Sequence, residues 1–173
     1  STDGEVMFLT DDSIFIDQVS LSVDLLEWLH KEPEHRQISL RTGKEFLSGD
    51  IKVMDGSVWS FADYSDRSIW GYRYSLDAHI YDCKEMYKFL KCATFKNPNT
   101  LESVGLLHAN KKSLFELGRN LGNVKILSYP INIVQTTFNN EALHADVATL
   151  NEYFINGYEL ELPLPEKIID FQV

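Results

Sequence analysis

The sequence predicts a single α+β domain over residues 1–173, built from an antiparallel β-meander packed against helices. Residues 37–75 contain short runs in which apolar and polar residues alternate, which is typical of half-buried antiparallel strands. From residue 82 onward, apolar residues recur instead at helical spacing between polar N-caps and terminal glycines. Because no Gly/Ser linker or internal repeat divides the 173 residues, we expect one hydrophobic core.

The clearest strand signal is the stretch GDIKVMDGSVWSFADY at residues 49–64. Two alternating runs flank Asp55-Gly56, a dipeptide that supplies the positive φ of a type I′ hairpin turn. A third strand is expected in SIWGYRYSLD, residues 68–77, where three aromatic residues at every second position would share one face. Since basic neighbours are few, we interpret this face as core, with a protein-binding surface as the alternative and an RNA-binding sheet disfavoured.

Shorter strands are expected on both sides of this region. The segments are SIFIDQVSLSV (13–23), in which the alternation slips once, VKILSYPINIVQTTF (124–138), which Pro130 divides, and residues 158–162.

Five segments have the pattern of helices. They are residues 22–32 with Ser22 as N-cap, 82–95 with Asp82 as N-cap, 100–109, 111–123 and 139–157. The last two end at glycines, which commonly terminate helices.

The two cysteines, Cys83 and Cys92, lie in the second of these helices. Nine residues of helix separate them by about 13 Å along the axis. A disulfide needs Cα atoms within about 7 Å, so we expect two unpaired, buried or half-buried thiols.

Charge is the most informative functional feature. The formal net charge is −10, and residues 1–30 contain seven acids and no lysine or arginine. Residues 126–173 contain seven more acids against a single lysine. The negative electrostatic potential of such a charge distribution repels nucleic acid and anionic membranes and favours a basic protein partner. Acidic residues also commonly increase the solubility of a protein. We therefore expect no nucleic acid and no membrane among the partners. Because no apolar run approaches the roughly 20 residues that span a bilayer, and because residues 1–10 lack the pattern of a signal peptide, we expect a cytoplasmic location.

The sequence contains no motif that indicates a particular enzymatic reaction. None of the five histidines has the spacing of a metal site, and no nucleophile elbow or phosphate-binding glycine loop is present. We therefore predict no catalytic residues, no metal and no cofactor. An acid/base site around His79, with Asp77 or Asp82, remains as the enzyme alternative.

Three parts of the chain together resemble a known class of proteins. They are the base-free stretch STDGEVMFLTDDSIFIDQVSLSVDLLEWLH, the stretch GDIKVMDGSVWSFADYSDRSIWGYRYS and the acidic C-terminal third. An acidic α+β domain of this kind is similar to the immunity proteins of bacterial toxin–immunity systems, of the contact-dependent growth inhibition type. The resemblance implies an antitoxin that binds and neutralises a cognate protein toxin, such as a nuclease with a basic cleft.

Acids and neighbouring aromatics are the residues that would bind such a partner. The candidates are Asp11, Asp12, Asp17, Asp24, Glu27, Tyr64, Asp66, Glu152 and Tyr153. An acidic mimic of nucleic acid and a subunit of a larger assembly are the remaining alternatives. The sequence leaves the oligomeric state open.

Overall fold

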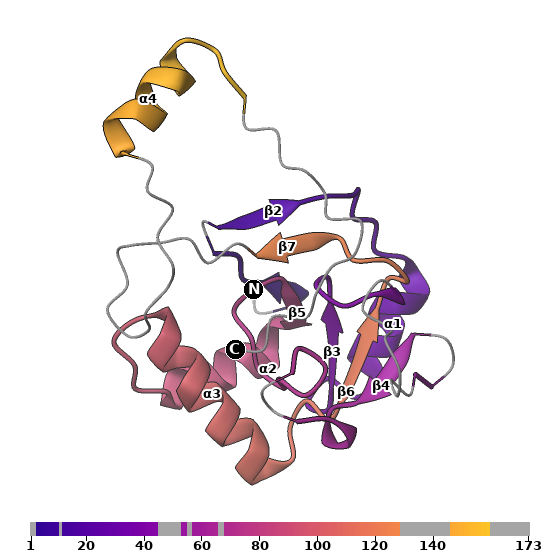
Figure 1. Ribbon diagram of the computed structural model, residues 1–173. Helices are drawn as coiled ribbons and strands as arrows, with labels where there is room; N and C mark the ends of the chain where they lie inside the picture. The colour runs from indigo at the N-terminus through magenta and orange to yellow at the C-terminus, as the bar shows by residue number, and fades with distance from the viewer. Residues whose placement is uncertain are drawn as a thin grey trace.

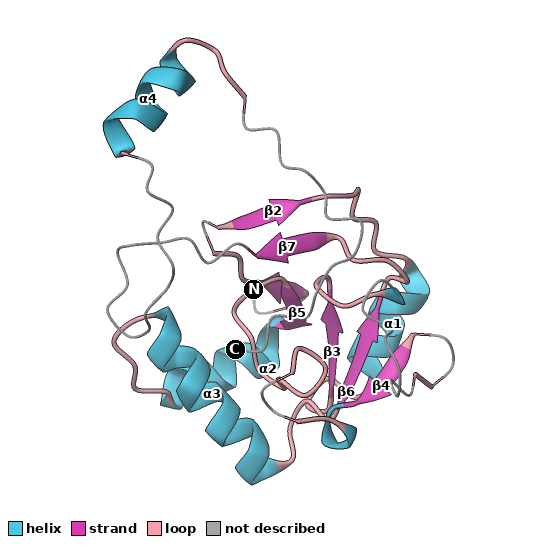
Figure 2. Cartoon of the chain, in the orientation of Figure 1, coloured by secondary structure: helices cyan, strands magenta, loops and turns pink. Residues whose placement is uncertain are grey.

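The computed structural model describes residues 3–10, 12–44, 53–54, 57–65, 68–128 and 146–159. These residues form four α-helices and two β-sheets, and the predicted α+β class is confirmed (Figures 1 and 2). The strands are β1 (Glu5–Met7), β2 (Ser13–Phe15), β3 (Arg36–Ser39), β4 (Val58–Ser60), β5 (His79–Asp82), β6 (Leu117–Asn120) and β7 (Ile126–Ser128). The helices are α1 (Val23–Lys31), the short 3-10 helix η2 (Phe61–Asp63), α2 (Cys83–Cys92), α3 (Pro98–Lys112) and α4 (Val147–Ile155).

The main sheet has the strand order β1-β5-β3-β6-β4, and β2 pairs with β7 in a second, small sheet. All neighbouring strands are antiparallel except β3 and β6, which run parallel. The neighbours are not consecutive in the sequence, so the chain crosses over between strands instead of running through the sheet as a simple meander.

Helices cover both faces of the main sheet, and β5 shows how the sequence achieves this. Successive residues of a strand point to opposite faces. Ile80 accordingly joins the cluster that contains Leu29 of α1, while Tyr81 joins the cluster that contains Phe89 of α2 and Leu101 of α3. The strand is buried on both sides, because His79, Ile80 and Tyr81 are all buried.

The third strand predicted at residues 68–77 is wrong. This segment forms turns, in which the backbone N–H groups of Gly71 and Tyr72 both donate to the carbonyl oxygen of Ser68. A Cβ atom added to Gly71 would lie 1.9 Å from the carbonyl oxygen of Ser65. The close approach of two backbone segments therefore requires glycine here, and it interrupts the expected alternation.

The aromatic residues of this segment nevertheless belong to the core. Trp70 packs edge-on against Trp59 with 4.9 Å between ring centroids, and its carbonyl oxygen accepts a 2.9 Å hydrogen bond from the Trp59 indole. Tyr74 stacks on Tyr81 at 5.7 Å. All four side chains are buried, so the interpretation of these aromatics as core is confirmed for Trp70 and Tyr74.

The helix predicted at residues 111–123 is also wrong. Helix α3 ends at Lys112, where Ser113 takes the left-handed conformation with φ at +51°, and β6 follows. Pairing with β3 and β4 determines this outcome, because Gly118 allows the Trp59 ring to lie directly on the strand. A Cβ atom at that position would be 2.3 Å from the ring.

The predicted helix starts are confirmed at two places. Ser22 accepts a hydrogen bond from the backbone N–H of Leu25, and Asp82 accepts one from Glu85. The third helix begins earlier than expected, because Asn97 is its N-cap.

The remaining expectations are met in part. The strand expected at 13–23 is limited to β2, and the described residues of 158–162, Tyr158 and Glu159, are not in a strand. Asp55-Gly56 lies outside the described residues, as do residues 129–145. Both cysteines are unpaired as predicted, but Cys92 is exposed rather than buried or half-buried.

Candidate functional site

Helix α4 carries the largest group of exposed apolar side chains among the described residues. Asp146 starts the helix by accepting a hydrogen bond from the backbone N–H of Thr149, and Gly157, at φ +77°, ends it. Figure 1 shows α4, in yellow, set apart from both sheets and from the other helices. Every residue from 146 to 159 is exposed.

We call the side chains of this region the α4 surface. Its apolar members are Val147, Leu150, Tyr153, Phe154, Ile155 and Tyr158, and its charged members are Asp146, Glu152 and Glu159. Phe154 is 78% exposed and Val147 74%. No lysine, arginine or histidine lies between residues 146 and 159, so the surface combines apolar area with negative charge only.

Part of the α4 surface has a fixed shape. The rings of Tyr153 and Tyr158 meet edge-on at 5.4 Å between centroids, and the backbone N–H of Tyr158 donates to the carbonyl oxygen of Tyr153. Together with Thr149, Glu152 and Asn156 they line a shallow hollow. Two of the predicted partner-binding residues, Glu152 and Tyr153, therefore lie side by side on an exposed surface.

The predicted acids of the N-terminal region lie elsewhere. Asp24 and Glu27 are exposed on α1, Asp12 is half-buried beside β2, and Asp17 is exposed but forms an ion pair with Lys125. Figure 1 places α1 and α4 on opposite sides of the view. Asp24 and Glu27 on α1 therefore do not share one surface with Glu152 and Tyr153 on α4.

The other candidates contribute less to a binding surface. Tyr64 is half-buried and packs against Trp70, with 6.2 Å between ring centroids, so it supports the aromatic core. Asp11 and Asp66 lie outside the described residues.

His79, the centre of the enzyme alternative, is inside the protein. It is 3% exposed, and neither ring nitrogen has a hydrogen-bond partner within the described residues. Burial, with a smaller contribution from Arg41, lowers the pKa of His79 to about 3, so the imidazole is neutral. Because the His79 imidazole is buried, it does not contact a substrate in solution.

The two acids of that alternative have structural partners. Asp77 accepts a 2.8 Å hydrogen bond from the Ser13 hydroxyl and pairs with Arg41 at 3.0 Å. Asp82 caps α2 and contacts His30. Neither carboxylate is directed at His79 by these contacts, so the geometry gives no support to an acid/base site there.

The buried polar residues beside His79 form a structural network. Glu102 of α3 accepts hydrogen bonds from the Ser75 hydroxyl at 3.1 Å and from the backbone N–H of Leu76 at 2.7 Å. Burial raises the pKa of Glu102 despite these hydrogen bonds. The network anchors the 68–78 turn segment to α3.

The described residues contain no group of three or more histidine, cysteine, aspartate or glutamate side chains arranged to hold a metal ion. They also contain no helix long and apolar enough to cross a membrane.

The sequence interpretation missed most of the α4 surface. It selected Glu152 and Tyr153 but not the apolar residues around them, because the candidates were chosen among acids and neighbouring aromatics. Val147, Leu150, Phe154 and Ile155 follow the i, i+3, i+7, i+8 spacing of one helical stripe. A buried helix face has the same spacing, so the sequence contains no signal that this stripe is exposed.

No protein-family model matches the chain, and comparisons with curated proteins and with solved structures find no match either.

Proposed function

We propose that this protein is an immunity-type inhibitor that binds a basic protein toxin through the α4 surface. The observation that carries the proposal is the α4 surface, which has six large exposed apolar side chains, three acids and no base. Contiguous exposed apolar area marks interaction sites in folded proteins. An isolated helix of nine residues is marginal in water, so a partner that covers α4 also stabilises it.

The chemistry of the α4 surface defines the partner. The apolar side chains fit a hydrophobic groove, in the way that amphipathic helices bind other proteins. Asp146, Glu152 and Glu159 favour a basic rim around that groove, as on an enzyme that handles anionic substrates. The cytoplasm is the compartment in which such an inhibitor would protect the cell that makes it.

The exposed acids of the N-terminal region have a different role in this proposal. Asp24 and Glu27 belong to α1, which Figure 1 shows on the other side of the view from α4, so in this proposal they increase the attraction at long range and do not contact the same groove. Asp17 contributes less, because Lys125 neutralises it.

The test is co-expression with the product of the neighbouring upstream gene, followed by affinity purification and growth assays. We expect a stoichiometric complex and rescue from toxicity. Tyr153→Ala should weaken the complex by tenfold or more, since a tyrosine at the centre of an interface often contributes about 2 kcal/mol.

The matched control is Tyr87→Ala on α2. Tyr87 is 50% exposed and Tyr153 is 53% exposed, so the two substitutions remove the same side chain at equal exposure. Tyr87→Ala should leave binding unchanged. Equal loss in both variants, or no binding and no rescue by the wild type, would reject the proposal. If the protein instead captures a DNA-binding protein that is not toxic, this result would favour the alternative that it acts as an acidic mimic of nucleic acid.

A further inference from the structure

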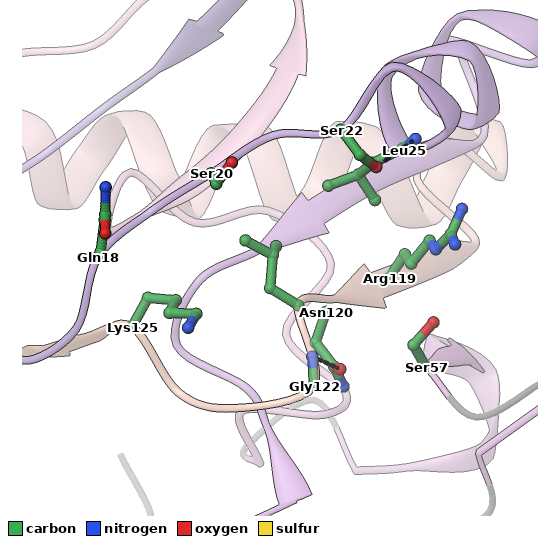
Figure 3. A pocket seen from close by; sticks show the side chains of 10 residues that line it. Gln18, Ser20, Ser22, Leu25, Ser57, Arg119, Asn120, Gly122 and Lys125 are labelled. Atoms are coloured by element: carbon green, nitrogen blue, oxygen red, sulfur yellow. Dashed lines mark hydrogen bonds between the residues drawn. The ribbon is translucent and has the colours of Figure 1, made fainter.

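A depression beside the start of α1 combines cationic and hydroxyl groups in a protein that is otherwise acidic. It has a volume of about 370 Å³. Figure 3 shows Arg119 and Ser57 on one side of it, Lys125 on the other, and Ser20 and Ser22 along the edge that leads into α1. Asn120 completes the floor. No carboxylate is among the ten residues that line the depression.

Arg119 is held in place by an aromatic ring instead of a carboxylate. Its guanidinium carbon lies 5.7 Å from the centroid of the Trp28 ring, and the guanidinium of Arg36 lies 5.0 Å from the same ring. Arg36 pairs with Glu32, whereas none of the ion pairs within the described residues involves Arg119. Arg119 is therefore an oriented cation without an acidic partner in that part of the chain.

Lys125 is a second oriented cation. Its ammonium group forms an ion pair with Asp17, an exposed carboxylate that precedes the lining residue Gln18 in the sequence. Asp24, in the first turn of α1, is the other exposed acid nearby in sequence. Both carboxylates weaken the attraction for an anion, and Asp17 competes with it directly for Lys125.

The backbone shapes the floor of the depression. Gly122, at φ +86°, allows a tight turn in which its N–H donates to the Asn120 side-chain oxygen at 2.9 Å. The N–H of Asn120 donates in turn to the carbonyl oxygen of Ser57, which joins β6 to the segment before β4. The positions of Ser57 and Asn120 are therefore set by the sheet.

We propose that this depression binds a small phosphate-bearing molecule. A guanidinium donates two parallel hydrogen bonds to a phosphate, and hydroxyl, amide and ammonium groups supply further donors. The volume is within the range of small-molecule sites, about 300 to 1,000 Å³. This site is separate from the α4 surface and does not depend on the proposed inhibitor function.

Titration of the full chain with pyrophosphate at low ionic strength, followed by calorimetry, tests the proposal. We expect saturable binding that Arg119→Gln weakens by tenfold or more. Arg119→Lys should weaken it less, because it keeps the charge but loses the bidentate geometry. Asp17→Asn should strengthen it, since Lys125 loses its competing partner.

The control is Lys112→Gln, which removes one positive charge at the exposed end of α3. It should change the affinity by less than twofold. Absence of saturable binding by the folded wild type, or equal weakening in Arg119→Gln and Lys112→Gln, would overturn the proposal. Circular dichroism of each variant establishes that it is folded.

Discussion

His30 joins three elements of the fold through its two ring nitrogens. It lies on α1, with Nε2 2.6 Å from Glu5 Oε1 on β1 and Nδ1 3.0 Å from Asp82 Oδ2 on β5. The hydrogen bond to Glu5, together with a smaller one to Asp82, raises the pKa of His30 above its ordinary value of 6.5. The protonated imidazole therefore stabilises the folded state.

This arrangement predicts a pH-dependent contribution to stability. Because the pKa of His30 is higher in the folded state, its contribution is complete below pH 6.5 and is lost as the pH rises through the raised pKa. The free energy of unfolding of the wild type minus that of His30→Gln should thus decrease as the pH rises above about 6.5. The amount is about 1 kcal/mol or less, since the side chain is substantially exposed.

The measurement is urea denaturation of both proteins across this pH range. The difference between them is needed because His79 and His108 have lowered pKa values and change stability in the opposite direction. A difference that is independent of pH would show that the ion pairs of His30 do not stabilise the fold.

Single residues also show where sequence reasoning succeeds. The burial of Trp70 and Tyr74 was predicted, because three large aromatics at every second position of this segment have few basic neighbours and so favour a core over a nucleic-acid-binding surface. The turn at Gly71 was not predictable, because it depends on the Ser65 carbonyl oxygen of the neighbouring segment. The same holds for His79, whose lack of polar partners follows from tertiary packing alone.

At the scale of elements, α3 depends on its N-terminal cap. The Asn97 side chain accepts a 2.9 Å hydrogen bond from the backbone N–H of Thr100, and the Thr100 hydroxyl accepts one at 3.0 Å from the backbone N–H of Asn97. Pro98 occupies the first turn, where its missing N–H costs nothing. The capping box thus satisfies two backbone donors at once.

We therefore expect Asn97→Ala to reduce the free energy of unfolding by about 1 kcal/mol. Thermal or urea denaturation measures this loss. The control is Asn110→Ala, in which the same exchange is made at an exposed position inside α3, where alanine is the better helix former. Equal stability of the two variants would mean that the cap is not needed.

The elements that could be predicted are those whose local signals agree with their tertiary contacts. Ser22 and Asp82 begin helices whose apolar residues also face the sheet, so α1 and α2 were predictable. Residues 114–121 contain apolar residues at helical spacing, but Leu117–Asn120 form β6, because pairing with β3 and β4 outweighs local preference. The pairing of β6 with β3 and β4 cannot be predicted from the local sequence.

At the scale of the whole molecule, the exposed acids of α1 are separated from the exposed apolar side chains of α4. The apolar groups around the main sheet are covered by α1, α2 and α3, while α4 keeps its apolar side chains exposed. The acidity was evident in the sequence. The separation of the N-terminal acids from α4 was not, because it depends on the path of the chain through the fold.

This separation predicts that salt and α4 substitutions affect different rate constants of the proposed complex. Long-range attraction between a protein of net charge −10 and a basic partner raises the association rate by about 10- to 1,000-fold at low ionic strength. The contacts of the α4 surface are short-range, so they determine mainly the dissociation rate. Salt should therefore slow association, and Tyr153→Ala should accelerate dissociation.

Stopped-flow or surface plasmon resonance measurements at increasing salt separate the two rate constants. The double variant Asp24→Asn/Glu27→Gln should reduce the salt dependence of association and leave dissociation unchanged, because these acids are remote from α4. Tyr153→Ala should show the reverse pattern. If Asp24→Asn/Glu27→Gln instead accelerates dissociation as much as Tyr153→Ala does, the partner contacts α1 directly, and α4 is not the only surface that it covers.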